Sequence, residues 1–198
     1  NNIKNVEIVN IATDTATTIT ALDSLVASGV TLTVNASILG ATNALTWNGT
    51  NETDGKFSIT GGAGSDSISG GSGADTISGG AGNDSIDGGA GNDTFYIANT
   101  THIDLANKTI IGGTGSADKL VLTVAGIDLV DTDFANVTGV ETVALTGASS
   151  IVLGANATKS GIATVITGNG NTTVVGGAAD VITVTGLATA SQTFTGSV

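Results

Sequence analysis

GGAGSDSIS (residues 61–69), GGSGADTIS (70–78), GGAGNDSID (79–87) and GGAGNDTFY (88–96) are four successive copies of one nine-residue sequence. Each copy has Gly at its first, second and fourth positions, Asp at its sixth and a large apolar residue at its eighth. The acidic residues are Asp66, Asp75, Asp84 and Asp93, and the apolar residues are Ile68, Ile77, Ile86 and Phe95. A flexible glycine-rich linker has no need to keep these two residue types in fixed phase, so the stretch predicts a regular, repeated structure.

The residue types in each copy indicate a metal site built from oxygen atoms. Glycines allow a tight turn that presents several backbone carbonyl groups to one point, and the Asp adds a charged oxygen. Ca²⁺ prefers six to eight such ligands, and Mg²⁺ should substitute poorly because it demands a smaller octahedron. Zinc and copper favour nitrogen and sulfur ligands, and the chain has no Cys and one His. Residues 61–96 contain neither Glu nor a basic residue, which excludes an EF-hand loop and a phosphate-binding loop.

The repeat follows the pattern G-G-x-G-x-D-x-U-x, and the chain therefore resembles the RTX (repeats-in-toxin) family of secreted proteins. The resemblance covers about a fifth of the chain. It implies a right-handed parallel β-roll in which each repeat is a turn followed by a short strand, with Ca²⁺ as the cofactor. Burial of three Ile and one Phe does not offset the entropy of ordering the block, so we expect folding to be coupled to calcium binding.

The resemblance also implies a ligand set, because calcium in RTX rolls lies between repeats that are eighteen residues apart. One repeat supplies the carbonyls of its second and fourth positions and its Asp, and the other supplies its first and third carbonyls and its Asp. Carried onto this sequence, the first site is Gly62, Gly64, Asp66, Gly79, Ala81 and Asp84, and the second is Gly71, Gly73, Asp75, Gly88, Ala90 and Asp93. Third and fourth ions would use Gly80, Gly82 and Asp84, or Gly89, Gly91 and Asp93, if later turns close them. Thr114 and Asp118 are the best candidates to close the last of these sites.

The remaining sequence predicts an all-β fold in three zones: a β-solenoid module (1–60), the calcium roll (61–96) and a second module that repeats the first (97–198). Runs rich in Val, Ile and Thr predict strands at residues 6–11, 30–34, 44–47 and 57–60. Residues 20–29 predict one or two helical turns that end at Gly29.

The two outer zones share matching sequences. Residues 4–11 match residues 138–145, and residues 28–34 match residues 160–166. This internal repetition favours one continuous right-handed parallel solenoid, although two separate globular domains could also carry a duplicated module. Weaker echoes of the metal motif follow the block. Residues 112–118 carry it with one inserted residue, and residues 176–180 carry it with one missing, where Asp180 reads as an ordinary turn residue.

Composition excludes several classes of function. The net charge of −12 and the pI of about 4.1 make nucleic acid an unsuitable partner, and no apolar run reaches the length of a membrane span. His102 is the only histidine, so neither a zinc site nor a catalytic triad can be assembled around histidines. Glu7 and Glu141 occupy matching module positions, which favours a repeated structural role over a glycosidase pair. We therefore predict that the chain is not an enzyme.

The region around residues 134–142, with the strands rich in Thr, Ala, Val and Gly that follow it, is similar to bacterial surface-layer proteins and large RTX surface proteins. The RTX resemblance implies type I secretion, and the surface-layer resemblance implies a location at the cell surface, in a surface layer or extracellular matrix. It also implies self-association into a lattice or filament, with surface polysaccharide as a further partner. Two other functions stay open: an RTX adhesin that grips a glycan or a partner cell, and an accessory roll of a secreted hydrolase or toxin.

Overall fold

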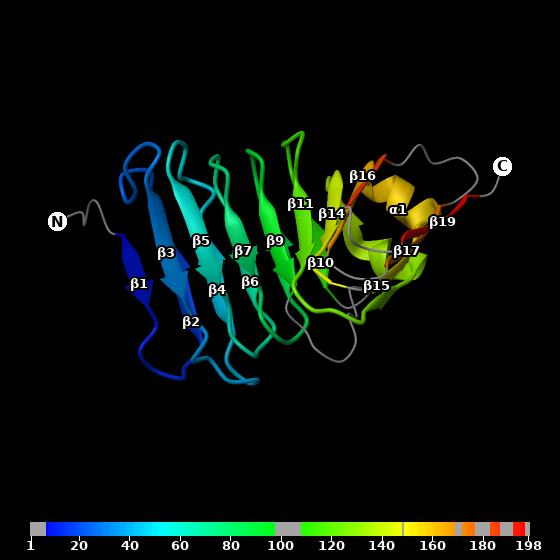
Figure 1. Ribbon diagram of the computed structural model, residues 1–198. Helices are drawn as coiled ribbons and strands as arrows, with labels where there is room; N and C mark the ends of the chain where they lie inside the picture. The colour runs from blue at the N-terminus through cyan, green and yellow to red at the C-terminus, as the bar shows by residue number, and fades with distance from the viewer. Residues whose placement is uncertain are drawn as a thin grey trace.

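Short parallel strands follow one another as the turns of a β-solenoid, which confirms the predicted all-β fold (Figure 1). The computed structural model describes residues 7–97, 108–147, 149–168, 172–176, 183–186 and 192–196. Two predicted features, Asp180 and His102, lie outside the described residues. Within the described parts of the chain, no helix is long and apolar enough to span a membrane.

Two sheets form the walls of the solenoid. The nine-stranded sheet runs, in spatial order, β1 (Ile8–Asn10), β3 (Thr31–Asn35), β5 (Lys56–Thr60), β7 (Thr76–Ser78), β9 (Thr94–Ile97), β11 (Lys119–Leu122), β14 (Thr142–Leu145), β16 (Thr164–Thr167) and β18 (Thr183–Gly186). The six-stranded sheet runs β2 (Thr17–Thr20), β4 (Leu45–Asn48), β6 (Ser67–Ser69), β8 (Ser85–Asp87), β10 (Thr109–Ile111) and β13 (Val137–Thr138). The repeat block and strands from both outer zones thus share continuous sheets.

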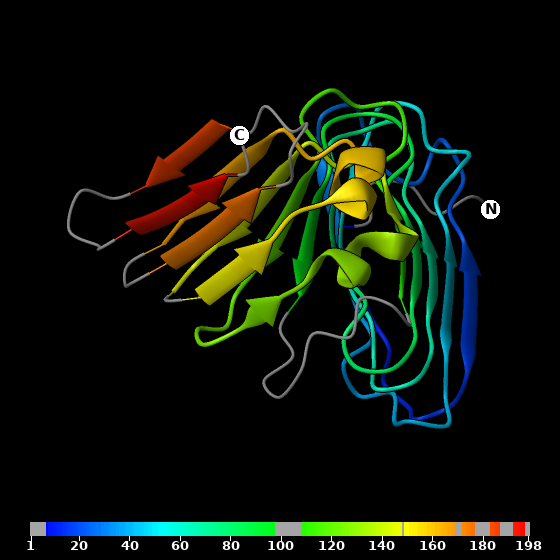
Figure 2. The ribbon, with the colours of Figure 1, turned by 90° about the vertical axis from the view of Figure 1, so that its right-hand side faces the viewer.

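A third wall forms in the C-terminal half. The four-stranded sheet contains β12 (Asp128–Leu129), β15 (Ser149–Val152), β17 (Thr172–Gly176) and β19 (Gln192–Gly196). A 3-10 helix (Asp131–Asn136) precedes β13, and helix α1 (Ala155–Ser160) packs against both. Figure 2, viewed from the C-terminal end, shows this third sheet splayed away from the two walls of the N-terminal half.

The repeat block builds the narrowest turns. Ser67 pairs with Ser85 and Thr76 pairs with Thr94, so each turn contains two nonapeptides, as the resemblance implies. Each three-residue strand of the block places one side chain in the interior: Ile68, Ile77 and Ile86 are at most 1% exposed. The strands β3 and β5, which precede the block, are five residues long, and their alternating side chains fill a wider core.

The four strands predicted before the block are confirmed as β1, β3, β4 and β5, but the predicted helix over residues 20–29 is wrong. Thr20 is the last residue of β2, and the backbone N–H of Ala21 continues the ladder by donating to Asn48 (2.8 Å). Ala21 and Val26 are both buried in the core. Parallel pairing and burial override a weak helical preference in so short a segment. Only Gly29 behaves as predicted, with a left-handed φ of 72°.

The matched runs of the two outer zones do occupy the same sheet. β1 and β14 belong to the nine-stranded sheet, and so do β3 and β16. In the second pair, however, the sequence alignment is out of phase by one residue. Leu32 is buried in β3, whereas its aligned counterpart Thr164 is half-buried and the neighbouring Val165 faces the core.

Candidate metal sites

Each repeat places its Asp immediately before a strand, so the acidic side chains gather where parallel strands begin. Asp75, Asp93 and Asp118 precede β7, β9 and β11 of the nine-stranded sheet; we call them the long row. Asp66 and Asp84 precede β6 and β8 of the six-stranded sheet; we call them the short row.

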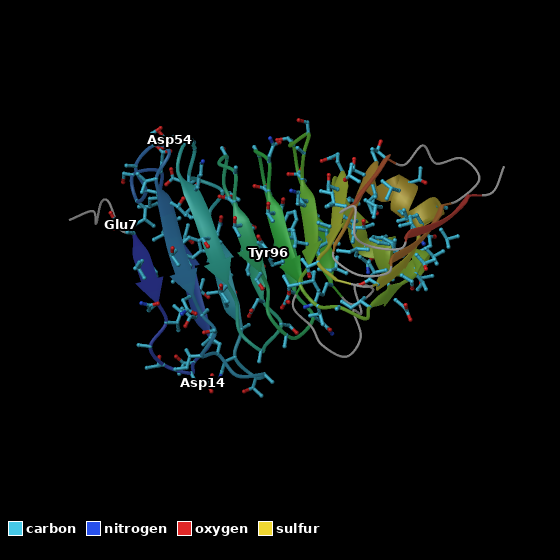
Figure 3. The ribbon with its side chains drawn as sticks, in the orientation of Figure 1. Glu7, Asp14, Asp54 and Tyr96 are labelled. Carbon is cyan, nitrogen blue, oxygen red and sulfur yellow. The ribbon has the colours of Figure 1, made fainter. Side chains whose placement is uncertain are left out.

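The strands of the two sheets begin at opposite edges of the solenoid. Figure 3 labels Glu7 and Asp54 at the edge where strands of the nine-stranded sheet begin, and Asp14 at the edge where β2 begins. The long row therefore follows the first edge and the short row the second.

Within a row, each carboxylate reaches back to the preceding turn. The backbone N–H of Asp75 donates to Asp93 Oδ1 (2.7 Å), and that of Asp93 donates to Asp118 Oδ1 (2.7 Å). In the short row the N–H of Asp66 donates to Asp84 Oδ1 (3.0 Å). The five side chains are at most 2% exposed. Successive carboxylates are thus stacked one turn apart. Asp118 accepts the same hydrogen bond as the Asp residues of the perfect repeats.

Two side chains that the sequence analysis did not assign to the rows, Glu141 and Lys108, lie at their ends. Glu141 extends the long row, because its Oε2 accepts the backbone N–H of Asp118 (2.8 Å). Its prediction as a structural residue fits this contact. Lys108 ends the short row: its ammonium donates to Asp84 Oδ2 (2.5 Å) and to the carbonyl oxygens of Gly80 (3.3 Å) and Gly82 (2.7 Å). The nonapeptide pattern gave no signal for Lys108, which lies outside it.

Glycine is required where the carbonyl oxygens of one turn approach the carboxylate of another. A Cβ on Gly70 would lie 2.1 Å from the carbonyl oxygen of Gly88 and 2.4 Å from Asp75 Oδ2. A Cβ on Gly88 would likewise lie 2.2 Å from Asp93 Oδ2 and 2.7 Å from the carbonyl oxygen of Gly112. These glycines therefore open a cradle lined by oxygen atoms at successive steps of the long row.

The step from repeat four to residues 112–118 copies the two steps before it. The backbone N–H of Ala81 donates to Gly62 O (3.0 Å), that of Ala90 to Gly71 O (2.9 Å) and that of Thr114 to Gly89 O (2.8 Å). Thr114 therefore stacks on the fourth repeat as the alanines stack on theirs, despite the inserted residue. Gly112, which the sequence analysis placed in the echo of the motif but not among the ligands, occupies the position of the first glycine of a repeat.

Burial changes the acidity of Asp66, Asp75 and Asp93. Desolvation raises the pKa of Asp75 to about 6 and that of Asp93 to about 7, against the lowering effect of the backbone hydrogen bonds that each accepts. The charges of Asp75, Asp118 and Asp87 raise the pKa of Asp93 further. Burial also raises the pKa of Asp66. A raised pKa marks a carboxylate that lacks a countercharge, which a bound cation would supply.

Two carboxylate oxygens identify where that cation is most needed. Among the described residues, Asp93 Oδ2 and Asp118 Oδ2 are buried and accept no hydrogen bond. They belong to successive turns of the long row, and unpaired oxygen atoms of this kind are destabilising in a protein interior. Backbone carbonyls that already accept one N–H keep a second lone pair for a metal. The donor set of carboxylate and carbonyl oxygens fits Ca²⁺.

The comparison with protein families agrees with this geometry. Residues 60–95 match the RTX calcium-binding nonapeptide repeat, with four copies. RTX repeats bind Ca²⁺ and have a structural rather than a catalytic role, and proteins that carry them are typically secreted. No curated protein and no solved structure matches the chain.

Proposed function

We propose that this chain is a structural segment of a secreted cell-surface protein, and that calcium folds and stiffens its repeat block. The observation that carries the proposal is the pair of buried carboxylate rows. In the long row, Asp93 Oδ2 and Asp118 Oδ2 accept no hydrogen bond among the described residues. Each row crosses from one turn of the solenoid to the next, so a cation bound in it ties consecutive turns together. The carboxylates and carbonyls hold the ion, and the glycine cradles keep side chains out of its way.

The geometry supports one ion in the short row and two in the long row. The short-row site is formed by Gly62, Gly64, Asp66, Gly79, Ala81 and Asp84. The first long-row site is formed by Gly71, Gly73, Asp75, Gly88, Ala90 and Asp93, and the second by Gly89, Gly91, Asp93, Gly112, Thr114 and Asp118. Each set contains two carboxylates and four carbonyls, which balances the charge of Ca²⁺ and reaches its lower coordination number.

Assembly into a surface layer or filament is the finer part of the proposal. It is supported by the similarity of residues 134–142 to surface-layer proteins, by the net charge of −12 and by the lack of Cys, which suits a protein whose folding depends on metal rather than disulfides. A rigid solenoid of stacked parallel strands is also a suitable building block for an extended assembly.

Two measurements test the proposal. Far-UV circular dichroism during a calcium titration should show a gain of strand signal that an equal concentration of Mg²⁺ does not reproduce. Electron microscopy of the same samples should then show ordered arrays or fibres only with calcium. Unchanged dichroism on adding calcium or a strong chelator would contradict calcium-dependent folding. A monomer that folds with calcium but binds glycans or cells saturably, without assembling, would favour the adhesin.

A further inference from the structure

We propose that Lys108 is a built-in cation that closes the short row, so that its ammonium takes the place of a second calcium ion at that edge. The inference rests on the proposed calcium sites, because it states where they stop. It predicts an unequal distribution of metal: one ion at the edge of the six-stranded sheet and two at the edge of the nine-stranded sheet.

The strand register puts Lys108 at the position of a repeat Asp. Thr109 pairs with Ser85 in the six-stranded sheet, as Lys119 pairs with Thr94 in the nine-stranded sheet. Lys108 therefore precedes β10 in the same way that Asp118 precedes β11. At the same step of the two rows, one edge of the solenoid carries an acid and the other carries a base.

The ammonium contacts the oxygen atoms that would otherwise bind metal. Lys108 Nζ donates to the carbonyls of Gly80 and Gly82 and to Asp84 Oδ2, which are the second, fourth and sixth positions of the third repeat. The equivalent carboxylate oxygen in the long row, Asp93 Oδ2, is buried and accepts no hydrogen bond within the described residues. The difference between a satisfied and an unsatisfied carboxylate thus coincides with the presence or absence of the lysine.

Because the contact between Lys108 and Asp84 is buried, it disfavours the binding of a metal ion at the same oxygen atoms. The side chains of Lys108 and Asp84 are 8% and 0% exposed, so their charges interact with little screening by solvent. A calcium ion at the same oxygens would have to displace the ammonium or lie beside it, and the second arrangement is strongly repulsive. The lysine is tethered to the chain and stays available when calcium is scarce.

Lys108 lies where we expect the metal sites of the short row to end. The six-stranded sheet has one further strand after β10, namely β13, and helix α1 then packs beside that strand. The long row carries Asp118 at this level and continues past it to Glu141. Lys108 therefore separates the turns that depend on metal from turns that pack by side chains and helices at this edge.

Replacement of the lysine by a ligand tests the inference. The variant K108D places a carboxylate where a repeat would have its Asp, and it should bind one more calcium ion per chain than the wild type. Native mass spectrometry and isothermal titration calorimetry count the ions. K159D is the matched control, because it makes the same change of net charge at an exposed position in α1 and should bind the wild-type number.

The outcomes separate this inference from the proposed function. If the wild type binds no calcium, the proposed function fails and the inference fails with it. If the wild type binds calcium and K108D, correctly folded, binds the same number, only the inference is overturned.

A measurement on the wild type covers the case in which K108D does not fold. The ¹⁵N-detected ammonium signal of Lys108 should be visible, protected from exchange and present with saturating calcium, and it should vanish in K108Q. An ammonium that exchanges freely in the calcium-saturated wild type would show that the lysine has left the site, and would overturn the inference.

Discussion

The repeat block and the turns that precede it share the same two sheets but are stabilised by different means. β3 and β5 are five residues long and each buries two apolar side chains, whereas β7 is three residues long and buries one. Trp47 and Phe57 pack edge to face in the wider turns, with ring centroids 5.2 Å apart. Residues 61–96 have little apolar surface to bury, so the interior there cannot order the chain alone.

The loops of the two regions also differ in how their carboxylates are hydrogen-bonded. Before the block, loop groups are satisfied within the protein: Asp14 accepts hydrogen bonds from Gly40 (2.7 Å) and Asn43 (2.8 Å), and Glu52 accepts one from Gly55 (3.1 Å). The long row, which starts in the block and continues to Asp118, instead leaves the buried Oδ2 atoms of Asp93 and Asp118 without hydrogen bonds among the described residues. We therefore expect metal to replace side-chain packing where the solenoid turn is shortest.

Removal of calcium should have the largest effect and should fall on one region. With a strong chelator, backbone amides in residues 61–96 should exchange at nearly unstructured rates, because the row carboxylates repel one another and the small core cannot compensate. Amides of residues 31–60 should stay partly protected by their own core. Hydrogen exchange followed by mass spectrometry resolves the two segments. Equal loss of protection in both would show that the solenoid folds as a single calcium-dependent unit.

Substitution of one shared ligand should have the next largest effect. Asp93 belongs to both proposed long-row sites, whereas Asp66 belongs to one site. We expect Asp93→Asn to lose two calcium ions and Asp66→Asn to lose one, as counted by calorimetry, while both variants keep the shape of the side chain. The same loss in the two variants would contradict the sharing of Asp93 between sites.

The parts of the structure that repeat strictly could be predicted from the sequence. The fixed phase of Asp and Ile gives the inward side chains and the regular spacing of the Asp residues, which depend only on local sequence, and the resemblance to RTX rolls gives the turn of two nonapeptides. The participation of Thr114 was proposed from the sequence, and the structure places it at the equivalent step of the long row. The helix over residues 20–29 failed because Thr20 pairs with Asn48 at the end of β2 and because Ala21 and Val26 are buried in the core, and such long-range contacts are not visible in local propensity.

Lys108 and Glu141 could not be predicted as members of the rows. Their roles depend on which strands pair with each other. The turns that contain them are also longer than eighteen residues, because Lys108 follows Asp84 by 24 positions and Glu141 follows Asp118 by 23 positions. The loops in those turns vary in length, so no fixed spacing marks the equivalent position. The out-of-phase match between β3 and β16 has the same origin.

Core truncation should distinguish the regions by its dependence on calcium. Leu32 and Ile77 are both fully buried in the nine-stranded sheet. Replacement by Ala should cost about 2–5 kcal/mol at either site in the calcium-bound protein. Without calcium, Leu32→Ala should still destabilise the chain, whereas Ile77→Ala should have little effect because its surroundings are already unfolded. Thermal unfolding with and without chelator measures both. An equal effect of Ile77→Ala in the two conditions would show that the core of the block is folded without calcium.

The smallest expected effect is that of pH, and its sign should differ with and without calcium. Burial raises the pKa of Asp93 to about 7 and that of Asp75 to about 6, from an ordinary 3.8, so the metal-free folded block holds these protons more tightly than the unfolded chain does. Metal-free stability should therefore be highest near or below about pH 4 and should fall as the pH rises to about 7.

Calcium reverses this trend because it binds the deprotonated carboxylates. The ion has to displace any proton that Asp75 and Asp93 hold, so its apparent Kd should weaken as acid protonates and orders the metal-free block, by up to about tenfold per pH unit for each proton displaced. Calorimetric titrations at about pH 8, 7 and 6 measure the change, and Asp93→Asn should show a smaller one because its side chain does not titrate. An apparent Kd that stays constant over this range would mean that acid does not order the metal-free block between about pH 8 and about pH 6, and that Asp75 and Asp93 are ionised before the metal binds.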